Sequence, residues 1–507
     1  MTAISCIVIQ AGGRGSRMDR LSRNKPKPLV PVNNLPIMFH LFRKYPSAHY
    51  VIIGDYKFDV LSKYLHEFAP QGLSYQLVNS SGHKGTCSGL NDALALVPEN
   101  SPFMLIWCDL ILPPEYQLPE LGERDVIGIS KDFPCRWMYE HDTFTEQRSD
   151  TQGVAGHFIF RDKSCLAGVP QDGEFVRWLQ ENHFTFTEQP LYHTREYGLY
   201  SEWAKLPKSR CRPFNRITRE GNILVKEGID AQGLSLAKRE AAWYRQVQDK
   251  HFTNIPEIYS YDPLRMEFID GRNIYEYTDI PDEGKRGILR QIISCLRDVH
   301  KLGSIPADRE SYYDAYLGKT WSRLQKVRNL APFAHDEYIT INGRKCRNIF
   351  FCQDKVSDLV MQFMPEKFVF IHGDCTFSNT MLRSNSQPVL IDPRGYFGRT
   401  EIYGDPAYDW VKLYYSLISN YDQFNLKRFD LAVNEHDVTL SIASNNWEGL
   451  EDYFFELLGG EVTRFQMKIL LALVWLSLTT YAWEDYDSIC GAYYNGLLYL
   501  EDALNMA

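Results

Sequence analysis

The sequence of 507 residues has few of the features that mark secreted or nucleic-acid-binding proteins. Its eleven cysteines are scattered and include no Cys-x-x-Cys pair, which disfavours a zinc site or a disulfide framework. The formal net charge is −9, whereas a general nucleic-acid-binding protein presents a basic face. We therefore expect a protein of the reducing cytoplasm with no nucleic-acid partner.

Long apolar runs are also missing. The first residues, MTAISCIVIQA, have neither a basic region nor a long apolar segment, so we expect no signal peptide here. The most apolar run, at 469–483, is shorter than the ~20 residues that a membrane span needs. It predicts a buried core helix, and we expect no membrane partner.

The length predicts more than one domain. In the first third, short apolar runs predict buried strands, and segments with helical apolar spacing lie between them. This alternation predicts an α/β domain with a parallel sheet covered on both faces, whose ligands bind beyond the carboxyl ends of the strands. The predicted strands are 5–11, 50–54, 73–78 and 102–110.

The first strand runs into a loop rich in glycine and positive charge, AGGRGSR, which is followed by KPKPLVPV. Glycines here can bring backbone N–H groups close to phosphate oxygens. The loop is not a dinucleotide fingerprint, because Met18 replaces the third glycine, and it lacks the Gly-Lys-Ser/Thr ending of a P-loop. The prolines stiffen the chain around Lys25 and Lys27, which suits fixed cationic groups.

The combined pattern G-G-x-G-[ST]-R-[ML] and K-P-K-P-L resembles the sugar-phosphate nucleotidyltransferases and the phosphocholine-type cytidylyltransferases, over roughly residues 3–205. The resemblance implies a Rossmann-like, GT-A-like sheet that binds an NTP and Mg²⁺ or Mn²⁺. A phosphate oxygen of a second substrate then attacks the α-phosphorus, and pyrophosphate leaves. It implies catalytic roles for Arg17 and Lys27, metal ligation by Asp109 and Glu196, and nucleotide binding by Gln10, Gly12, Gly13, Gly15, Lys25, Gly85 and Thr86.

A basic stretch without periodicity, 206–213, predicts a linker between domains. Beyond it, FNRITREGNILVKEGID predicts two strands around a glycine turn, with Lys226 on the second strand. The next apolar-periodic segment predicts a helix that carries Glu240. By themselves a lysine and a glutamate so placed predict no more than a surface ion pair.

The stretch FVFIHGDCTFSNTML, followed by PVLIDPRGYFG, has the spacing of a kinase catalytic loop and its metal-binding successor. In the form H-G-D-x-x-x-x-N it resembles the aminoglycoside phosphotransferase and choline kinase family, over roughly residues 214–507. The resemblance implies a bilobal α+β protein-kinase-like domain that uses ATP. It also implies that Asp374 orients or deprotonates the acceptor hydroxyl, that Asn379 and Asp392 hold Mg²⁺ or Mn²⁺, and that Lys226, fixed by Glu240, contacts the ATP phosphates.

Other residues of this region receive supporting roles from the same resemblance. Asp409 is expected to anchor the structure, and His372 to orient the catalytic loop. Two features depart from the family: no kinase-type glycine-rich loop is evident, and Arg394 and Arg399 follow the metal-binding Asp392. These arginines fit a product phosphate, an anionic acceptor or internal salt bridges equally well.

Together the two resemblances imply a bifunctional enzyme. We expect the kinase to phosphorylate a small hydroxyl compound and the first domain to transfer a nucleotidyl group to it from an NTP, CTP or UTP. The expected product is an NDP-activated sugar, polyol or amino alcohol for surface or capsule polysaccharide or for cell-wall synthesis. One alternative is a choline or ethanolamine kinase joined to a phosphocholine-type cytidylyltransferase. Another class is a regulatory nucleotide-binding protein with one inactive domain. The expected partners are nucleotides and small molecules, and the sequence leaves the oligomeric state open.

Overall fold

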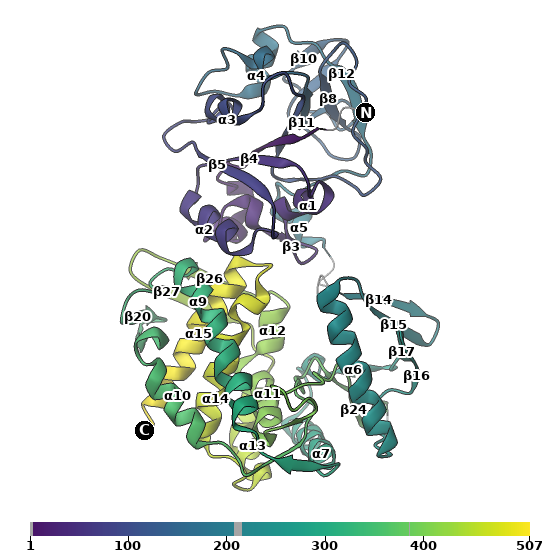
Figure 1. Cartoon of the computed structure of the whole chain (residues 1–507), viewed down its shortest axis with the longest axis vertical. Coiled ribbons are helices and arrows are strands. Elements are labelled where there is room, and N and C mark those ends of the chain that lie inside the picture. The colour runs from purple at the N-terminus through teal and green to yellow at the C-terminus, as the bar shows by residue number, and fades with distance from the viewer. Residues whose placement is uncertain (1–3, 207–214, 385, 507) are drawn as a thin grey trace. The chain divides into compact units, whose positions relative to one another are not determined.

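The computed structural model describes residues 4–206, 215–384 and 386–506 (Figure 1). The chain divides into two compact units, one of residues 1–207 with 484–487, the other of residues 208–483 with 488–507. The predicted domains were 1–205 and 214–507, and the linker residues 207–213 lie outside the described residues. The grouping of 484–487 with the first unit was not predicted, because four residues that return to an earlier domain leave no pattern in the sequence.

The first unit is built on strand β1 (Cys6–Gln10), which pairs in parallel with β4 (His49–Gly54) and β6 (Phe103–Trp107). Strand β5 (Ser74–Asn79) extends the parallel part beyond β4. The connecting helices, which confirm the predicted alternation together with these strands, are α1 (Ile37–Lys44), α2 (Phe58–Phe68) and α3 (Leu90–Leu96). The carboxyl ends of β1 and β6 lie side by side, which brings the loops after them together.

The other half of the sheet is mainly antiparallel, so the predicted parallel pairing is confirmed for β1, β4, β5 and β6, and the strands that follow them were not predicted. Strand β11 (Gly153–Phe160) runs antiparallel to β6 and carries the sheet on to β9 (Met138–Glu140) and β10 (Thr143–Thr145). Strand β8 (Val126–Ser130) pairs with β11 and β12 (Thr187–Leu191). Strands of three residues are too short to show an alternating pattern.

Strand β11 carries an irregularity beside the end of β6. Its register against β8 shifts between Val154 and Phe158, and Gly156 has a φ of 78°. A Cβ atom on Gly156 would lie 1.9 Å from the Trp107 ring, so only glycine leaves room for the indole. Trp107 ends β6 two residues before Asp109, and its placement therefore fixes how the chain enters the predicted metal site.

The shorter elements of the first unit lie after the glycine loop and near the end of the domain. Strand β7 (Leu110–Ile111) pairs with β13 (Arg195–Glu196), and β2 (Pro31–Val32) pairs with β3 (Leu35–Pro36). The helices are η1 (Ser16–Ser22), η2 (Lys27–Leu29), η3 (Lys163–Leu166), α4 (Phe175–Glu181) and α5 (Tyr200–Ala204).

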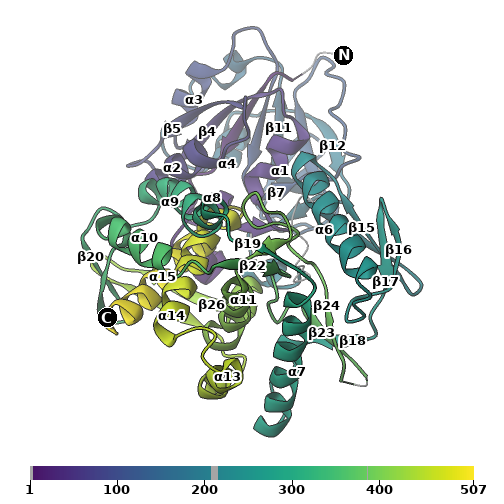
Figure 2. The ribbon, with the colours of Figure 1, turned by 60° about the horizontal axis from the view of Figure 1, so that its bottom comes forward.

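The second unit begins with an antiparallel sheet in the order β14 (Asn215–Glu220), β15 (Ile223–Gly228), β17 (Leu264–Glu267), β16 (Ile258–Tyr261). Helix α6 (Ala231–Asp249) runs beside this sheet in both ribbon views (Figures 1 and 2). The Asp230 side chain accepts a hydrogen bond from the Gly233 amide and caps the start of the helix. The hairpin and the helix confirm the sequence prediction.

The rest of the second unit is mainly helical, and its strands form small sheets. One sheet joins β18 (Gly271–Asn273), β23 (Thr380–Arg383) and β24 (Pro388–Leu390), and a second joins β19 (Ser304–Pro306), β22 (Lys367–Phe370) and β25 (Tyr403–Gly404). A third has the order β21 (Arg344–Arg347), β20 (Tyr338–Ile341), β27 (Val438–Ile442), β26 (Phe429–Val433). The helices are α7 (Asp282–His300), α8 (Arg309–Tyr313), a π-helical turn (Asp314–Gly318), α9 (Lys319–Leu330), α10 (Gln353–Gln362), α11 (Pro406–Ser419), α12 (Tyr421–Asn425), α13 (Glu451–Leu458), α14 (Arg464–Leu478) and α15 (Tyr486–Leu504).

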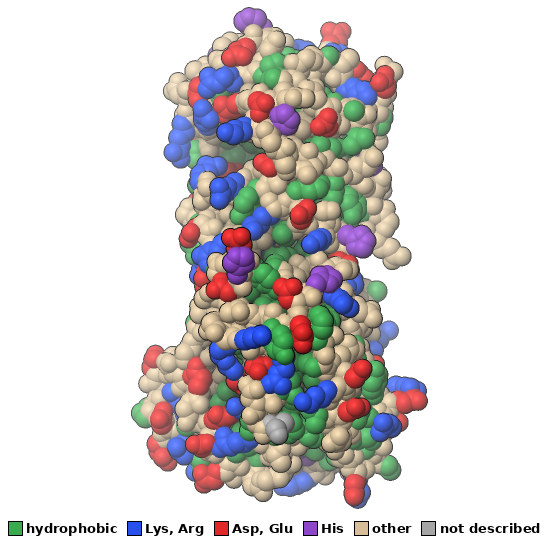
Figure 3. All heavy atoms as spheres, turned by 90° about the vertical axis from the view of Figure 1, so that its left-hand side faces the viewer, with side chains coloured by type: hydrophobic (Ala, Val, Ile, Leu, Met, Phe, Trp, Pro, Cys, Tyr) green, Lys and Arg blue, Asp and Glu red, His purple; other side chains and the backbone are tan. Residues whose placement is uncertain are grey.

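Helix α14 contains the most apolar run of the sequence. Among the described residues, the segment Arg464–Ala482 has the length and composition of a membrane-crossing helix, and 72% of its most apolar window is buried inside the structure. This burial agrees with the predicted core helix. On the face drawn in Figure 3, Lys and Arg side chains are interspersed with Asp and Glu.

Candidate active sites

The glycine loop of the first unit begins where β1 ends. Gly15 has a φ of 65°, which side-chain-bearing residues adopt rarely. The Gln10 amide donates to the carbonyl oxygens of Thr86, at 2.9 Å, and Ser88, at 3.0 Å, and its own oxygen accepts from the Gly12 amide at 3.3 Å. Gln10 therefore ties the glycine loop to the segment around Gly85 and Thr86. Its predicted contact with the nucleotide base stays a prediction.

Gly85 and Thr86 are held against the loop that precedes α4. Gly85 has a φ of 88°, and a Cβ atom there would lie 2.1 Å from the carbonyl oxygen of Gly173. The Thr86 hydroxyl accepts a hydrogen bond from the Phe175 amide at 2.8 Å, at the first turn of α4. The close packing of this segment against Gly173 therefore requires glycine at position 85.

We expect Gly85→Ala to lower nucleotidyl transfer by about 10²-fold, because displacing a binding segment by about 1 Å has an effect of that size. The matched control is Gly82→Ala. Gly82 also has a left-handed φ, 99°, but no atom lies within 4 Å of the point that a Cβ atom would occupy there, so this change introduces strain without overlap. Pyrophosphate release and the unfolding temperature are measured for both variants. Equal losses in the two variants would contradict the packing role of Gly85.

Three charged side chains of the first unit converge after β6. The Lys27 ammonium group pairs with Asp109 at 2.6 Å. Pairing of β13 with β7 sets Glu196 opposite Leu110, and the Tyr197 amide donates to the Asp109 carbonyl at 2.9 Å. A Cβ atom on Gly198 would lie 2.1 Å from Glu196 Oε1 and 3.0 Å from Asp109 Oδ2, so both carboxylates border one small space. The structure thus brings together the two predicted metal ligands and Lys27.

The electrostatics of this cluster follow from burial and from the two carboxylates. Burial and the neighbouring Asp109 raise the pKa of Glu196 to about 7, against the opposing effect of Lys27 and Arg17. Burial disfavours the charged form of Lys27, but Asp109 and its other acidic neighbours outweigh this and raise its pKa above the ordinary value. Two carboxylates that repel each other across one space form a donor set that suits Mg²⁺ or Mn²⁺. Arg17 lies exposed on η1.

Lys25 differs from the prediction. Its side chain is buried, and its Nζ pairs with Asp487 and, at 3.1 Å, with Asp485, within the segment 484–487 that groups with the first unit. These two carboxylates outweigh the effect of burial and raise the pKa of Lys25. In this structure the charge of Lys25 is therefore compensated by carboxylates, in place of the predicted nucleotide phosphate.

In the second unit, the predicted Lys226–Glu240 pair is formed. The Lys226 ammonium group lies 2.7 Å from Glu240 on α6 and 2.7 Å from Asp392, which follows β24. Glu240 is buried, with one carboxylate oxygen that has no hydrogen-bond partner among the described residues, and burial raises its pKa to about 7 against the effect of Lys226. Asp392 has a φ of 53°, a strained conformation that recurs at functional sites.

The catalytic loop, residues 372–379, is joined by hydrogen bonds to the segment that follows β24. The Ile391 amide donates to the Asn379 carbonyl at 3.0 Å, and the Arg394 amide donates to the His372 carbonyl at 2.9 Å. His372 Nε2 donates to the Ile391 carbonyl at 3.0 Å, while its Nδ1 accepts from the Asp374 amide at 3.2 Å. His372 thus orients the loop, as the sequence analysis predicts.

Asp374 is half-buried and ionised. The Asn379 side-chain nitrogen donates to its carboxylate at 3.0 Å, and Lys412 pairs with it at 2.8 Å. Burial opposes ionisation, but Lys412 and Arg394 lower the pKa of Asp374 below its ordinary value. The side-chain nitrogen of Asn379 donates its hydrogen bond to Asp374, so the amide oxygen of Asn379 stays available as a metal ligand. This oxygen and the Asp392 carboxylate are hard donors of the kind that fits Mg²⁺.

Asp409 on α11 anchors the start of the catalytic loop. Its carboxylate accepts hydrogen bonds from the His372 amide at 3.0 Å, the Gly373 amide at 2.7 Å and the His300 ring at 3.0 Å. Asp409 is fully buried, so each donor depends on this one carboxylate.

We expect Asp409→Asn to lower both the kinase turnover and the free energy of unfolding, the latter by about 1–3 kcal/mol, because an amide nitrogen then faces a donor. Denaturant unfolding and ADP release measure the two effects. Asp298→Asn is the control, since Asp298 lies on the exposed side of α7 and pairs with Lys301. Unchanged turnover in a variant that has lost stability would contradict the anchoring role.

Sequence reasoning missed several cations beside Asp374. Lys412 lies in YGDPAYDWVKL, and Lys319 in an aromatic stretch that predicts core packing, so neither had a motif of its own. Of the two arginines after Asp392, Arg394 is half-buried and lies among these cations, whereas Arg399 is exposed and pairs with Glu310.

Each unit thus contains its own cluster of charged and polar side chains, and each matches a different family of transferases. Residues 7–125 match the family described as MobA-like NTP transferase domain, and residues 224–437 match the phosphotransferase enzyme family. The chain therefore joins a nucleotidyltransferase domain to a phosphotransferase domain.

Curated relatives match part of the chain. Mannose-1-phosphate guanylyltransferase of Mycobacterium tuberculosis is 31% identical over 186 residues, 33% of this chain and 51% of the relative. The probable glucose-1-phosphate cytidylyltransferase of Bacillus subtilis is 28% identical over 78 residues, 15% of this chain and 31% of the relative. The chain thus spans about half the length of these relatives, or less. Among solved structures, HddC from Yersinia pseudotuberculosis is 18% identical with a TM-score of 0.34, covering 40% of this chain and 97% of that one.

Proposed function

We propose that this chain catalyses two successive transfers. The phosphotransferase domain moves the γ-phosphoryl group of ATP to a hydroxyl group of a small molecule and releases ADP. The nucleotidyltransferase domain then joins the new phosphate monoester to the nucleotidyl group of an NTP, CTP or UTP, and releases pyrophosphate. The observation that carries the proposal is that each unit brings charged and polar side chains together: Lys27, Asp109 and Glu196 in one, and Lys226, Glu240, Asp374, Asn379 and Asp392 in the other.

In the nucleotidyltransferase domain, Lys27 and Arg17 neutralise the charge that develops on the α-phosphate as the monoester oxygen attacks. The amides of the glycine loop, at Gly12, Gly13 and Gly15, bind phosphate oxygens. Asp109 and Glu196 would hold Mg²⁺, which supplies further charge neutralisation at the phosphates. The ion pair with Asp109, at 2.6 Å, holds the Lys27 ammonium group beside this carboxylate.

In the phosphotransferase domain, ionised Asp374 accepts the proton of the acceptor hydroxyl. Lys226, held by Glu240, contacts the ATP phosphates, and Asn379 and Asp392 would hold the Mg²⁺ that accompanies them. His372 and Asp409 hold the catalytic loop in shape through their hydrogen bonds.

The product we propose is an NDP-activated sugar or polyol that serves surface or capsule polysaccharide synthesis in the cytoplasm. The relatives whose names specify mannose 1-phosphate or glucose 1-phosphate support a sugar over an amino alcohol such as choline.

A label placed in ATP tests the two steps together. The full chain is incubated with γ-³²P-ATP, Mg²⁺, each of the four NTPs in turn and a panel of sugars, polyols and amino alcohols. The label is expected in the phosphate next to the acceptor in an NDP-linked product, and EDTA is expected to stop its formation. ADP release without any labelled ester would contradict the kinase step, and a labelled monoester that no NTP converts would contradict the second step.

A further inference from the structure

We infer that the acceptor phosphorylated by the second unit carries an anionic group, a carboxylate or a phosphate, in addition to its reacting hydroxyl. A cluster of four cations beside Asp374, made of Lys319, Arg323, Arg394 and Lys412, binds this group. The inference rests on the proposed kinase function of the same unit and specifies the class of its substrate.

The cluster is assembled around the hydroxyl group of Tyr408. This oxygen accepts hydrogen bonds from Lys319, at 2.8 Å, and from Arg394. Arg394 also donates to the Tyr396 hydroxyl at 2.8 Å. Lys412 follows Tyr408 by one helical turn on α11 and pairs with Asp374 at 2.8 Å. Lys412 thus joins the cluster directly to Asp374, the predicted catalytic base.

Lys319 and Arg323 come from a different helix, α9, which begins directly after the π-helical turn Asp314–Gly318. Residues four apart lie on the same face of a helix, and like charges at this spacing repel each other. Arg323 donates to the carbonyl of Ser477. Both side chains are half-buried, so water screens the repulsion less than at an open surface.

The charges of the cluster do not balance within it. Among the contacts of these four side chains, one carboxylate, Asp374, faces four positive groups, and the other partners are phenols and a backbone carbonyl. Burial and the neighbouring cations lower the pKa of Lys319 well below its ordinary value. This direction is the one that an excess of positive charge produces. An anion bound here would remove the imbalance, and a cationic acceptor would increase it.

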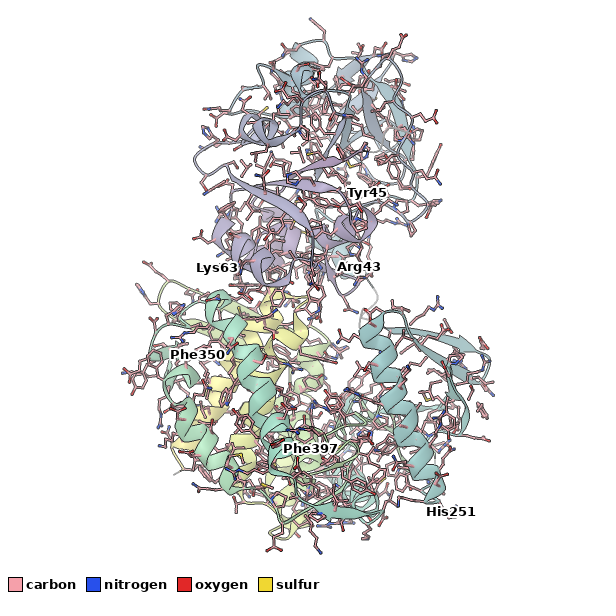
Figure 4. All side chains as sticks on the ribbon, viewed as in Figure 1. Arg43, Tyr45, Lys63, His251, Phe350 and Phe397 are labelled. Carbon is pink, nitrogen blue, oxygen red and sulfur yellow. The ribbon has the colours of Figure 1, made fainter. Side chains whose placement is uncertain are left out.

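Aromatic packing keeps the cluster rigid. The Lys319 ammonium group lies 4.8 Å from the centre of the Tyr408 ring, and the Arg394 guanidinium lies 4.3 Å from that of Tyr396. Phe397, labelled in Figure 4, is buried and packs against the Tyr408 ring at 5.4 Å between centroids. Cations fixed in this way differ from solvated surface charges, because little ordering remains when a ligand binds.

The cluster belongs to the acceptor side of the reaction. Lys412 of the cluster pairs with Asp374 at 2.8 Å, whereas Lys226 pairs with Asp392 at 2.7 Å. The predicted ATP-binding group and the cluster are therefore attached to different carboxylates. A small molecule with its hydroxyl at Asp374 can place a second, anionic group among the four cations.

Matched pairs of acceptors test the inference with the full chain, ATP and Mg²⁺. Glycerate is compared with glycerol for a carboxylate, mannose 6-phosphate with mannose for a phosphate, and choline represents a cationic acceptor. We expect the anionic member of at least one pair to have a higher kcat/KM by about 10- to 100-fold, the effect of one or two charge-assisted hydrogen bonds. The pair that responds identifies the anion. Equal or better use of the neutral or cationic acceptors would overturn the inference while leaving the kinase function intact.

Two variants locate the effect. Arg394→Gln is expected to raise KM for the anionic acceptor by about 10- to 100-fold and to leave the KM for ATP unchanged. Arg399→Gln is the control, because Arg399 is exposed and pairs with Glu310 outside the cluster. A KM for the acceptor that is unchanged in Arg394→Gln would overturn the assignment.

A binding experiment covers the case in which no acceptor in the panel is phosphorylated, a result that would count against the proposed function as tested. Calorimetric titration of inorganic phosphate or malonate into the full chain is expected to show a binding event that Arg394→Gln removes and Arg399→Gln retains. If neither ion shows such an event, the anion site does not exist.

Discussion

Asp374→Asn is expected to lower phosphorylation of the acceptor by about 10²–10⁴-fold, the usual contribution of a general base. The amide keeps the size of the side chain and the contact with Asn379, but it can no longer take the hydroxyl proton or balance Lys412. Nucleotidyl transfer to an acceptor supplied already phosphorylated is expected to stay near the wild-type rate, because its residues lie in the other unit. ADP and pyrophosphate release measure the two activities in one preparation.

Asp358→Asn is the matched control, since Asp358 is exposed on α10 and is not part of the predicted site. Loss of both activities in a well-folded Asp374→Asn protein would contradict the assignment of one reaction to each unit. Wild-type phosphorylation by this variant would remove Asp374 from the catalytic role.

Lys27→Met is expected to lower nucleotidyl transfer and to spare phosphorylation, the reverse of Asp374→Asn. Nucleotidyl transfer should fall by about 10²–10³-fold, since one charge-stabilising group is removed from the transition state, while phosphorylation continues. The loss should appear in kcat as well as in kcat/KM, because the developing charge exists only in the transition state. Pyrophosphate release with a phosphorylated acceptor gives both constants.

Lys63→Met is the control for this change. Lys63, labelled in Figure 4, lies exposed on α2 of the same unit. Because Lys27 pairs with Asp109 in a partly buried setting, the unfolding temperature of both variants is also measured. A Lys27→Met protein with wild-type pyrophosphate release would show that the lysine has a structural role alone.

The sequence was most informative where a short stretch contains a whole functional unit. The glycine loop after Gln10 and the loop from His372 to Asn379 each place their residues within a short stretch, so both could be located through the family motifs they resemble. Glu196 was predicted from the resemblance, and the pairing of β13 with β7 brings it beside Asp109.

Contacts between distant parts of the chain were not predictable. Lys25 meets carboxylates more than 450 residues later, and nothing in KPKPL distinguishes it from Lys27, which meets Asp109. The cations around Tyr408 come from α9, α11 and the segment after β24, and each taken alone resembles an ordinary surface charge. Strands β9 and β10 of the antiparallel half were missed because three residues are too few to show a period.

Gly156 supports the predicted metal site by leaving room for a neighbouring side chain. The Trp107 ring occupies the space where any other residue at position 156 would place its Cβ atom, and Trp107 stands two residues before Asp109. A larger residue can therefore replace Gly156 only if residue 107 also becomes smaller. Residues 107 and 156 should vary together among descendants of this chain, although neither belongs to a recognised motif.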